Sequence, residues 1–244
     1  MHDYWNHSGV DLEVLRPLEK LNHVNGHCPF TNGHWLAKGG GKEEKFDAVV
    51  TTIPVPQLLA TPPRPEGFIE GNFLDVVPLD ILNKLKAVRY NSVSCLGVFF
   101  DIAVAEALGI SWRAKYFPED PVIRYISIDT ARRGNPSSPT SICVQSHVSF
   151  AEKNLHKTKQ EMQEPLLDAL YRLLPELPPP ASLVSHKWRY SQTSVPYENT
   201  PGAVLLHQGP TLIAAGDSFS HSNFDGCLAS AHAASKMLKK ILAK

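Results

Sequence analysis

Two short apolar runs give the clearest strand signals in the chain. Residues 46–53 read FDAVVTTI and residues 211–215 read TLIAA. Both runs are apolar on both faces, which is typical of a strand buried on both sides in a parallel sheet. Pro54 and Pro56 end the first run, because proline has no N–H to donate to a neighbouring strand. We therefore predict that the two runs are strands of one parallel sheet.

The material between these runs has a different pattern. A three-residue spacing of leucines predicts a helix over 79–88, and a longer leucine stripe, ended by Pro175, predicts a second helix over 152–174. Several strand candidates are bounded by Pro, Gly or Asp, as in an antiparallel sheet. These candidates lie at 92–101, 123–129, 141–148 and 182–190. The fold class is therefore α/β with an α+β insertion, in which one sheet is interrupted by a large inserted domain.

The segment before the first run has the features of a hairpin. Residues 34–37 are a candidate for one arm, and three glycines at 39–41 form a turn that precedes a solvated charge run at 42–45. Prolines 62, 63 and 65 predict a stiff connection after the first run. At the other end, a polar loop at 218–223 leads into a helix over 224–242.

Composition narrows the classes of function. The chain has 244 residues, 43% of them apolar, and its 24 basic and 24 acidic residues cancel to a net charge of zero. Such a chain has no broad electrostatic attraction to nucleic acid or an anionic membrane. The sequence contains no transmembrane run or signal peptide. Histidines 7, 23, 27 and 34 are crowded near the start, but we assign no metal site to them. Its four cysteines form no C-x-x-C pair, which favours a reducing, cytoplasmic location over secretion.

The turn after the last strand is the best candidate for chemistry. Gly216 lets a ligand approach the backbone, and Asp217 follows at the carboxyl edge of the strand, where open α/β sheets bind ligands. The free N–H groups of the following helix would stabilise an anion at the same place. The alternative interpretation is a plain strand–loop–helix crossover in which Asp217 only caps the helix.

Four segments resemble one known family in sequence and order. Residues 215–231 resemble the closing FAD motif of the renalase family of FAD-dependent, amine-oxidase-like flavoproteins, and 222–227 (SNFDGC) is the most specific part. The other three are similar to the strand that re-enters the FAD domain, a strand of the substrate domain and a strand that returns toward the flavin. They lie at 46–56, 123–129 and 187–192.

The resemblance implies the C-terminal part of a FAD-binding, Rossmann-like domain with an inserted antiparallel-sheet substrate domain. Residues 1–57 would be a partial FAD-binding domain, 58–208 the substrate domain, and 209–244 the closing strand and helix. Asp217, beside Gly216, would bind the ribityl or pyrophosphate side of FAD. Residues at the helix start would lie under the flavin ring: Asn223, Phe224, Asp225 and Gly226. The substrates implied are isomeric reduced nicotinamide dinucleotides, or amines, with oxygen as the electron acceptor.

One departure from this family is large. Families of this fold open with a strand, a G-x-G-x-x-G turn and a helix, and we find no such segment in the chain. We therefore expect an amino-terminally truncated form in which FAD binding is impaired. The alternative is a non-catalytic variant that acts through protein–protein association, since a truncated sheet exposes a strand edge and an apolar face.

Aromatic residues near the end of the inserted domain are candidates for substrate binding. Trp188 and Tyr190 alternate along a strand, so we expect them to share a face that stacks a nicotinamide or an amine. Core packing is the alternative role. His147 and His186 are candidate acid–base groups that we interpret as structural. No catalytic residue is assigned.

Overall fold

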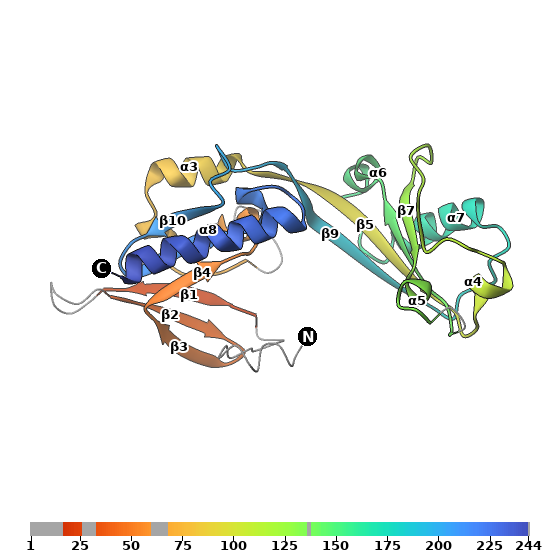
Figure 1. Cartoon of the computed structure of the whole chain (residues 1–244), viewed down its shortest axis with the longest axis horizontal. Helices are drawn as coiled ribbons and strands as arrows, with labels where there is room; N and C mark the ends of the chain where they lie inside the picture. Colours follow the sequence, from red (N-terminus) through yellow and green to blue (C-terminus); the bar gives the residue numbers. More distant parts are fainter. Residues whose placement is uncertain (1–16, 26–32, 60–67, 136–137, 244) are drawn as a thin grey trace. The chain divides into compact units, whose positions relative to one another are not determined.

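The computed structural model describes residues 17–25, 33–59, 68–135 and 138–243. The chain divides into two compact units, one formed by residues 1–89 with 193–244 and the other by residues 90–192. Figure 1 shows that the first unit is built from both ends of the sequence. The second unit covers fewer residues than the insertion predicted at 58–208. The described residues of that range before 90 and after 192 belong to the first unit. The proline-rich connection at 62–65 lies outside the described residues.

The small sheet of the first unit has the strand order β10-β11-β4. Its strands are β10 (Ala203–His207), β11 (Thr211–Ala215) and β4 (Ala48–Thr51). As predicted, β11 runs parallel to β4, and Ile213 lies opposite Val50. All of β11 is buried, but Val50 is 41% exposed. The prediction that both strands are buried on both faces is therefore wrong for β4, which is an edge strand among the described residues.

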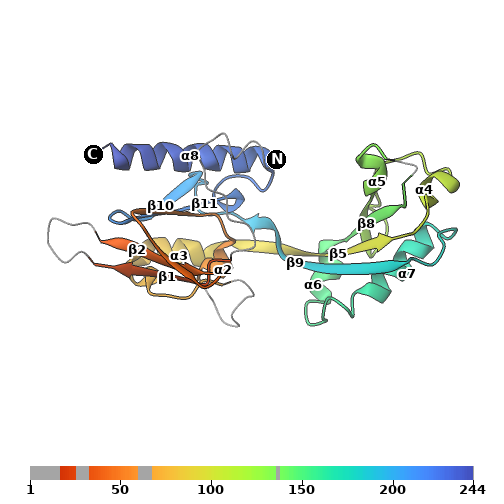
Figure 2. The ribbon, with the colours of Figure 1, turned by 90° about the horizontal axis from the view of Figure 1, so that it is seen from below.

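Helix α8 (Phe224–Leu242) begins and ends where the sequence predicts. Its partly buried residues Met237 and Leu238 pack with Ile213 of β11 and Leu205 of β10. Figure 2 shows α8 on one side of β10 and β11, with β1 and β2 on the other. The helix therefore covers two of the three strands of the small sheet.

A second three-stranded sheet has the order β1-β2-β3. It consists of β1 (Lys20–Val24), β2 (His34–Gly39) and β3 (Lys42–Phe46). The predicted hairpin arm is β2, and the turn uses Gly40 and Gly41, both at positive φ. The charge run at 42–45 is solvated, as predicted, because every residue of β3 is exposed. That it forms a strand was not predicted. The buried Trp35 ties this sheet to the small one, because its Nε1 donates to the carbonyl of Thr211 at 2.9 Å.

Among the described residues before residue 90, the first unit also contains three short helical elements. They are α2 (Val55–Leu59), η1 (Phe73–Val76) and α3 (Leu79–Ala87). Helix α3 matches the prediction to within one residue, and Leu85 of its predicted stripe is fully buried. Leu79, at the start of the stripe, is 70% exposed. The leucine spacing therefore located the helix but overstated the width of its buried face.

The second unit contains a five-stranded sheet with the order β6-β7-β8-β5-β9. Its described strand pairs are antiparallel, as predicted. The four strand candidates correspond to β5, β7, β8 and β9, whereas the short β6 was not predicted. The bounds are β5 (Arg89–Phe99), β6 (Ala114–Tyr116), β7 (Ile123–Ile128), β8 (Ser141–Ser146) and β9 (Ser182–Val195). Two four-residue helices, α4 (Val104–Ala107) and α5 (Asp129–Arg132), join these strands.

The long helix predicted over 152–174 is two helices, α6 (Val148–Lys153) and α7 (Gln163–Leu173). Between them, Thr158 and Glu161 form reciprocal hydrogen bonds: the Thr158 amide donates to the Glu161 carboxylate, and the Glu161 amide donates to the Thr158 hydroxyl. This arrangement satisfies the free amides of a new turn and interrupts the helix. Leu166 and Leu170 of α7 still form the core of the unit, as the leucine stripe predicts.

Candidate functional site

The turn after β11 requires glycine for conformational reasons. Gly216 has φ 128° and ψ −178°, a backbone region that is essentially restricted to glycine. A Cβ atom added at Gly216 would stand 3.6 Å from the carbonyl oxygen of Thr52, the nearest atom outside the adjoining residues. Backbone conformation, not crowding, therefore excludes other residues here. The chain then enters the short 3-10 helix η2 (Asp217–Phe219).

Asp217 is held by two hydroxyl groups of the first unit. Its Oδ2 accepts from Ser222 Oγ at 2.7 Å and from Thr193 Oγ1 at 3.3 Å. Ser222 Oγ also accepts from the Thr193 amide at 2.9 Å. The carboxylate is thus fixed in orientation and keeps further acceptor capacity. The alternative interpretation, in which Asp217 only caps α8, is wrong, because the cap is another residue.

The N-cap of α8 is Asn223. Its side-chain oxygen accepts from the amide of Gly226 at 2.7 Å. The amides of Phe224 and Asp225 have no hydrogen-bond partner among the described residues, as expected in a first helical turn. Phe224 is 76% exposed. The helix therefore presents two unpaired N–H groups at its start.

Gly226 is required for close packing. A Cβ atom at this position would stand 1.9 Å from the carbonyl oxygen of His221. The loop therefore folds back tightly over the first turn of α8. Ser218 and Phe219, earlier in the same loop, are almost completely buried. The structure thus brings the predicted residues 216–226 together, with a buried loop and an exposed helix start.

Ser230 is a residue of this site that sequence reasoning missed. It is fully buried in α8, where its Oγ accepts from the Gly216 amide at 2.7 Å and donates to the Gly202 carbonyl at 2.6 Å. One hydroxyl therefore links α8 to the end of β11 and to the residue before β10. A serine in an otherwise alanine-rich stretch was the only available signal.

Two cavities of the first unit lie away from this turn. One, of about 340 Å³, is lined by residues such as Leu21, Ala37 and Val49. The other, of about 500 Å³, is lined by residues such as Asn22 and Phe73. No residue of the 216–226 segment lines either cavity. The candidate site is therefore a helix start and a turn, and it lies outside both cavities.

In the second unit, Trp188 and Tyr190 have separate partners. Trp188 hydrogen-bonds the Cys95 thiol and packs against His186 with ring centroids 4.5 Å apart. Tyr190 packs edge-on against Tyr90 at 5.6 Å. The alternation of burial along β9 is interrupted between the two residues. No single platform formed by both rings is therefore evident, although Trp188 is 54% exposed and free to stack a ligand.

Burial perturbs the titratable groups around these aromatic residues. It raises the pKa of the Cys95 thiol to about 12, and the nearby Cys143 adds to this shift, which the hydrogen bond from Trp188 partly opposes. Burial also raises the pKa of the Tyr190 phenol, and the charge of Arg189 opposes this. Cys95 is therefore protonated near neutral pH, and we assign it no nucleophilic role.

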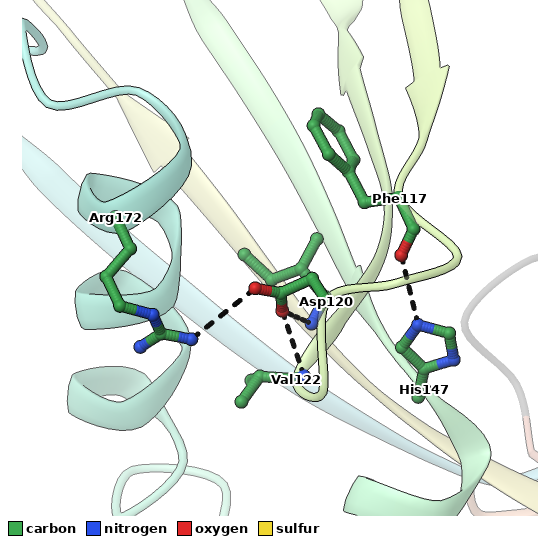
Figure 3. Close-up of polar contacts among 6 residues, drawn as sticks. Phe117, Asp120, Val122, His147 and Arg172 are labelled. Atoms are coloured by element: carbon green, nitrogen blue, oxygen red, sulfur yellow. Dashed lines mark hydrogen bonds and ion pairs between the residues drawn. The ribbon is translucent and has the colours of Figure 1, made fainter.

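The two candidate histidines have structural partners. His147 Nε2 lies 3.2 Å from the carbonyl oxygen of Phe117 (Figure 3). The neighbouring turn is fixed by Asp120, whose Oδ1 accepts from the amides of Val122 and Ile123 and whose Oδ2 pairs with Arg172. His186 packs against Trp188. The contact of His147 with Phe117 joins the start of α6 to the β6–β7 turn.

The sequence profile of the flavin-containing amine oxidoreductases matches residues 1–238. The chain therefore belongs to this family, whose cofactor is flavin.

Mouse (Mus musculus) renalase is 34% identical over 225 residues, which cover 91% of this chain and 63% of renalase. The chain thus spans less than two thirds of this relative. Two solved structures show the same fold at low identity. A putrescine oxidase has a TM-score of 0.60 at 10% identity, with 98% of this chain and 51% of the oxidase covered. Cyclohexylamine oxidase from Brevibacterium oxydans has a TM-score of 0.54 at 13% identity, with 91% and 48% covered. Among the described residues, none of the helices is long and apolar enough to cross a membrane.

Proposed function

We propose that this chain contributes the closing flavin-binding turn and the substrate unit of a renalase-like, FAD-dependent oxidoreductase. The observation that carries the proposal is the glycine-only conformation of Gly216, followed by an oriented Asp217 and the free amides of α8. In this proposal the first unit is the partial FAD-binding domain, and residues 90–192 form the substrate domain.

The groups at the turn fit a flavin chemically. Reduced flavin carries negative charge around N1 and the C2 carbonyl, and two unpaired amides at a helix start favour such a charge. Ser222 and Thr193 both donate to Oδ2 of Asp217. The other carboxylate oxygen, Oδ1, can therefore accept a hydrogen bond from a ribityl hydroxyl. Gly216 has no side chain that would limit approach to the backbone. These residues are the ones we expect to hold FAD.

When bound, FAD would supply the redox chemistry, taking a hydride from the substrate and passing electrons to oxygen. The chain's own contribution is orientation. Asn223 fixes the start of α8 so that the amides of Phe224 and Asp225 point outward. Trp188 offers an exposed ring on which a nicotinamide could stack. No residue of the chain needs to act as a general base for hydride transfer, which depends mainly on geometry.

For the substrate, we propose an isomeric reduced nicotinamide dinucleotide, and an amine as the second candidate. The similarity to mouse renalase supports the first substrate, and the family supports the second. Oxygen as acceptor, with hydrogen peroxide as product, follows from the same resemblance.

The test is to titrate the purified chain with FAD and record the flavin absorbance and the quenching of FAD fluorescence. Reduced nicotinamide isomers, ordinary reduced nicotinamide dinucleotide and an amine are then compared by peroxide formation. The Gly216→Ala variant should lose FAD binding because alanine is strained at φ 128°. Gly134→Ala, at another positive-φ glycine with open space around it, should leave FAD binding unchanged. A wild-type chain that leaves FAD fluorescence unquenched contradicts the proposal.

A further inference from the structure

Three aromatic rings meet where β1 and β2 lie beside the small sheet (Figure 2). His23 comes from β1, Trp35 from β2 and His207 from β10. The ring centroid of His23 is 5.0 Å from that of His207 and 5.3 Å from that of Trp35, and the centroids of Trp35 and His207 are 5.9 Å apart. Each ring therefore contacts the other two. We name these three residues the ring cluster.

Two hydrogen bonds connect the ring cluster to the start of β11. The fully buried Trp35 donates from Nε1 to the carbonyl of Thr211 at 2.9 Å. His207 Nδ1 lies 2.8 Å from the carbonyl oxygen of Pro210. Because a carbonyl oxygen can only accept, Nδ1 carries the hydrogen of this bond, and Nε2 is the atom that would take up an added proton. The cluster thus holds the two residues at the start of β11 while both imidazoles remain able to titrate.

The charges that act on His23 all oppose its protonation. Burial lowers the pKa of His23, and repulsion from His207 and then from His34 adds to the shift. Lys20 and Lys38 lie opposite each other three residues along their strands, so they point to the other face of the sheet. The neighbouring segments carry the carboxylates of Glu19, Glu44, Asp47, Glu70 and Asp75. Among the described residues, none of these carboxylates contributes to the pKa shift of His23.

Protonation therefore opposes the contact between the three rings. A proton on His23 places a cation in a partly buried site beside the second imidazole of His207. Separation of the rings lets water solvate this cation and increases its distance from His207. The separated arrangement thus binds the proton more readily than the closed one. The closed arrangement is fully favoured above the ordinary histidine pKa of about 6.5 and becomes less favoured as the pH falls through that value.

We propose that the ring cluster is a proton-sensitive latch, which holds β1 and β2 against the start of β11 when both imidazoles are neutral. Uptake of a proton opens the latch and separates the indole of Trp35 from the carbonyl of Thr211. Strand β11 ends at Ala215, directly before Gly216, so the latch acts on the strand that carries the candidate turn. This inference concerns the contact between two sheets of the first unit and does not depend on whether the turn binds flavin.

The test follows hydrogen exchange of the Trp35 indole N–H by NMR in the full chain, relative to a tryptophan model peptide at the same pH. At about pH 5.5, a free imidazole with a pKa of about 6.5 is protonated about ten times more often than not, so one histidine can favour opening by at most about tenfold. We therefore expect the protection of this N–H to fall about three- to tenfold between about pH 7.5 and about pH 5.5. At both pH values it should be at least about tenfold less protected than the Ile213 amide, since the latch opens without unfolding β11.

His23→Phe keeps a ring beside Trp35 and His207 but cannot take up a proton, so the protection of the indole N–H should change by less than about twofold over the same pH range. His23→Gln, whose side chain is also uncharged, should give the same result, and thermal melting checks that each variant is folded. The matched control is His232→Phe, at an exposed position of α8, which should retain the full decrease. No decrease in the wild type, or a decrease that persists in both His23 variants, would overturn the proposal. Equal protection of Trp35 and Ile213 would also overturn it, since the whole unit would then unfold at once.

Discussion

The hydroxyl of Ser230 accepts a hydrogen bond from the backbone amide of Gly216 at 2.7 Å. This bond joins the buried side of α8 to the turn after β11. The same hydroxyl donates to Gly202, so a single buried atom connects the helix to both strands beneath it. The orientation of the candidate flavin turn therefore depends on a side chain that is fully buried in the helix.

Ser230→Ala should lower the free energy of unfolding by about 1–3 kcal/mol, because it leaves the Gly216 amide and the Gly202 carbonyl without their partner in a buried site. Urea unfolding measures this change. Ser235→Ala makes the same replacement at an exposed position of α8 and should change stability by less than about 0.5 kcal/mol. Equal effects of the two variants would show that the Ser230 bonds contribute nothing.

Gly226→Ala tests two opposing effects at one position. Helix propensity alone favours alanine over glycine by about 1 kcal/mol. The added Cβ, however, would lie 1.9 Å from the His221 carbonyl oxygen, and relieving such a clash with backbone typically costs about 1–3 kcal/mol or more. We therefore expect net destabilisation in thermal melting. Cys227→Ala, at the next and exposed position, should be neutral or stabilising, and a stabilised Gly226→Ala variant would contradict the packing described above.

His23 makes the stability of the first unit pH-dependent. Burial lowers the pKa of His23, with repulsion from His207 and His34 adding to the shift. The unfolded chain therefore binds this proton more readily, so the contribution to stability is complete above the ordinary pKa of about 6.5. It decreases as the pH falls through that value and levels off below the folded-state pKa. Asn72, whose side chain forms hydrogen bonds with the backbone of His23, is uncharged and therefore does not offset this loss of stability.

The measurement is urea unfolding at about pH 7.5 and about pH 5.5. His23→Phe keeps an aromatic ring beside Trp35, whose ring centroid lies 5.3 Å from that of His23, but removes the titration. The variant should lose less stability than the wild type between the two pH values. If the two proteins lose the same amount, another group is responsible for the pH dependence.

Asp120 and Arg172 should contribute unequally to the free energy of unfolding, although they form one ion pair. Asp120→Ala removes the acceptor of two amides, at 2.9 Å and 2.7 Å, and should cost about 1–3 kcal/mol. Arg172→Ala removes only a 3.6 Å pair from a side chain that is 53% exposed, and should cost less than about 1 kcal/mol. Chemical denaturation of both variants decides between them, and a larger loss for Arg172→Ala would reverse this assignment.

The thiol of Cys95 should react slowly with alkylating reagents. With a pKa of about 12, it holds far less thiolate near neutral pH than an ordinary cysteine, and the thiolate is the reacting species. Timed alkylation, followed by peptide mass, should show Cys95 reacting at least about tenfold more slowly than the exposed Cys227. Trp188→Phe removes the hydrogen bond that opposes this shift, so it should slow Cys95 further. Rapid alkylation of Cys95 in the folded wild type would contradict its burial.

The sequence predicted the elements whose local pattern and tertiary role agree. Strand β11 and helix α8 were predicted to the residue, because a fully buried strand and an alanine-rich helix with a basic last turn leave strong local signals. The parallel pairing of β4 with β11 followed from their shared apolar character. The same pattern misjudged the burial of Val50, since burial depends on whether neighbouring elements cover the strand, which no local pattern records.

Other errors have identifiable physical causes. The predicted helix over 152–174 ignored the reciprocal bonds between Thr158 and Glu161, which favour a new turn over a continuous helix. At the site, motif spacing identified Gly216, Asp217 and Asn223, but not that Asn223 caps the helix or that Ser222 orients Asp217. Such roles depend on which side chains meet after the loop folds. Ser230 was missed for the same reason, since a lone serine in a helix has no periodic signature.

The close approach of Gly202 to Ala233 restricts how this sequence can change over time. Gly202 has φ 81° and cannot readily acquire a side chain, and Ala233 stands where a Cβ on Gly202 would be 2.7 Å away. The spacing between strand and helix is thus set by the two smallest residues. Substitutions at 233 should therefore be confined to alanine and glycine in functional descendants, and any larger residue there should appear only together with a displaced helix.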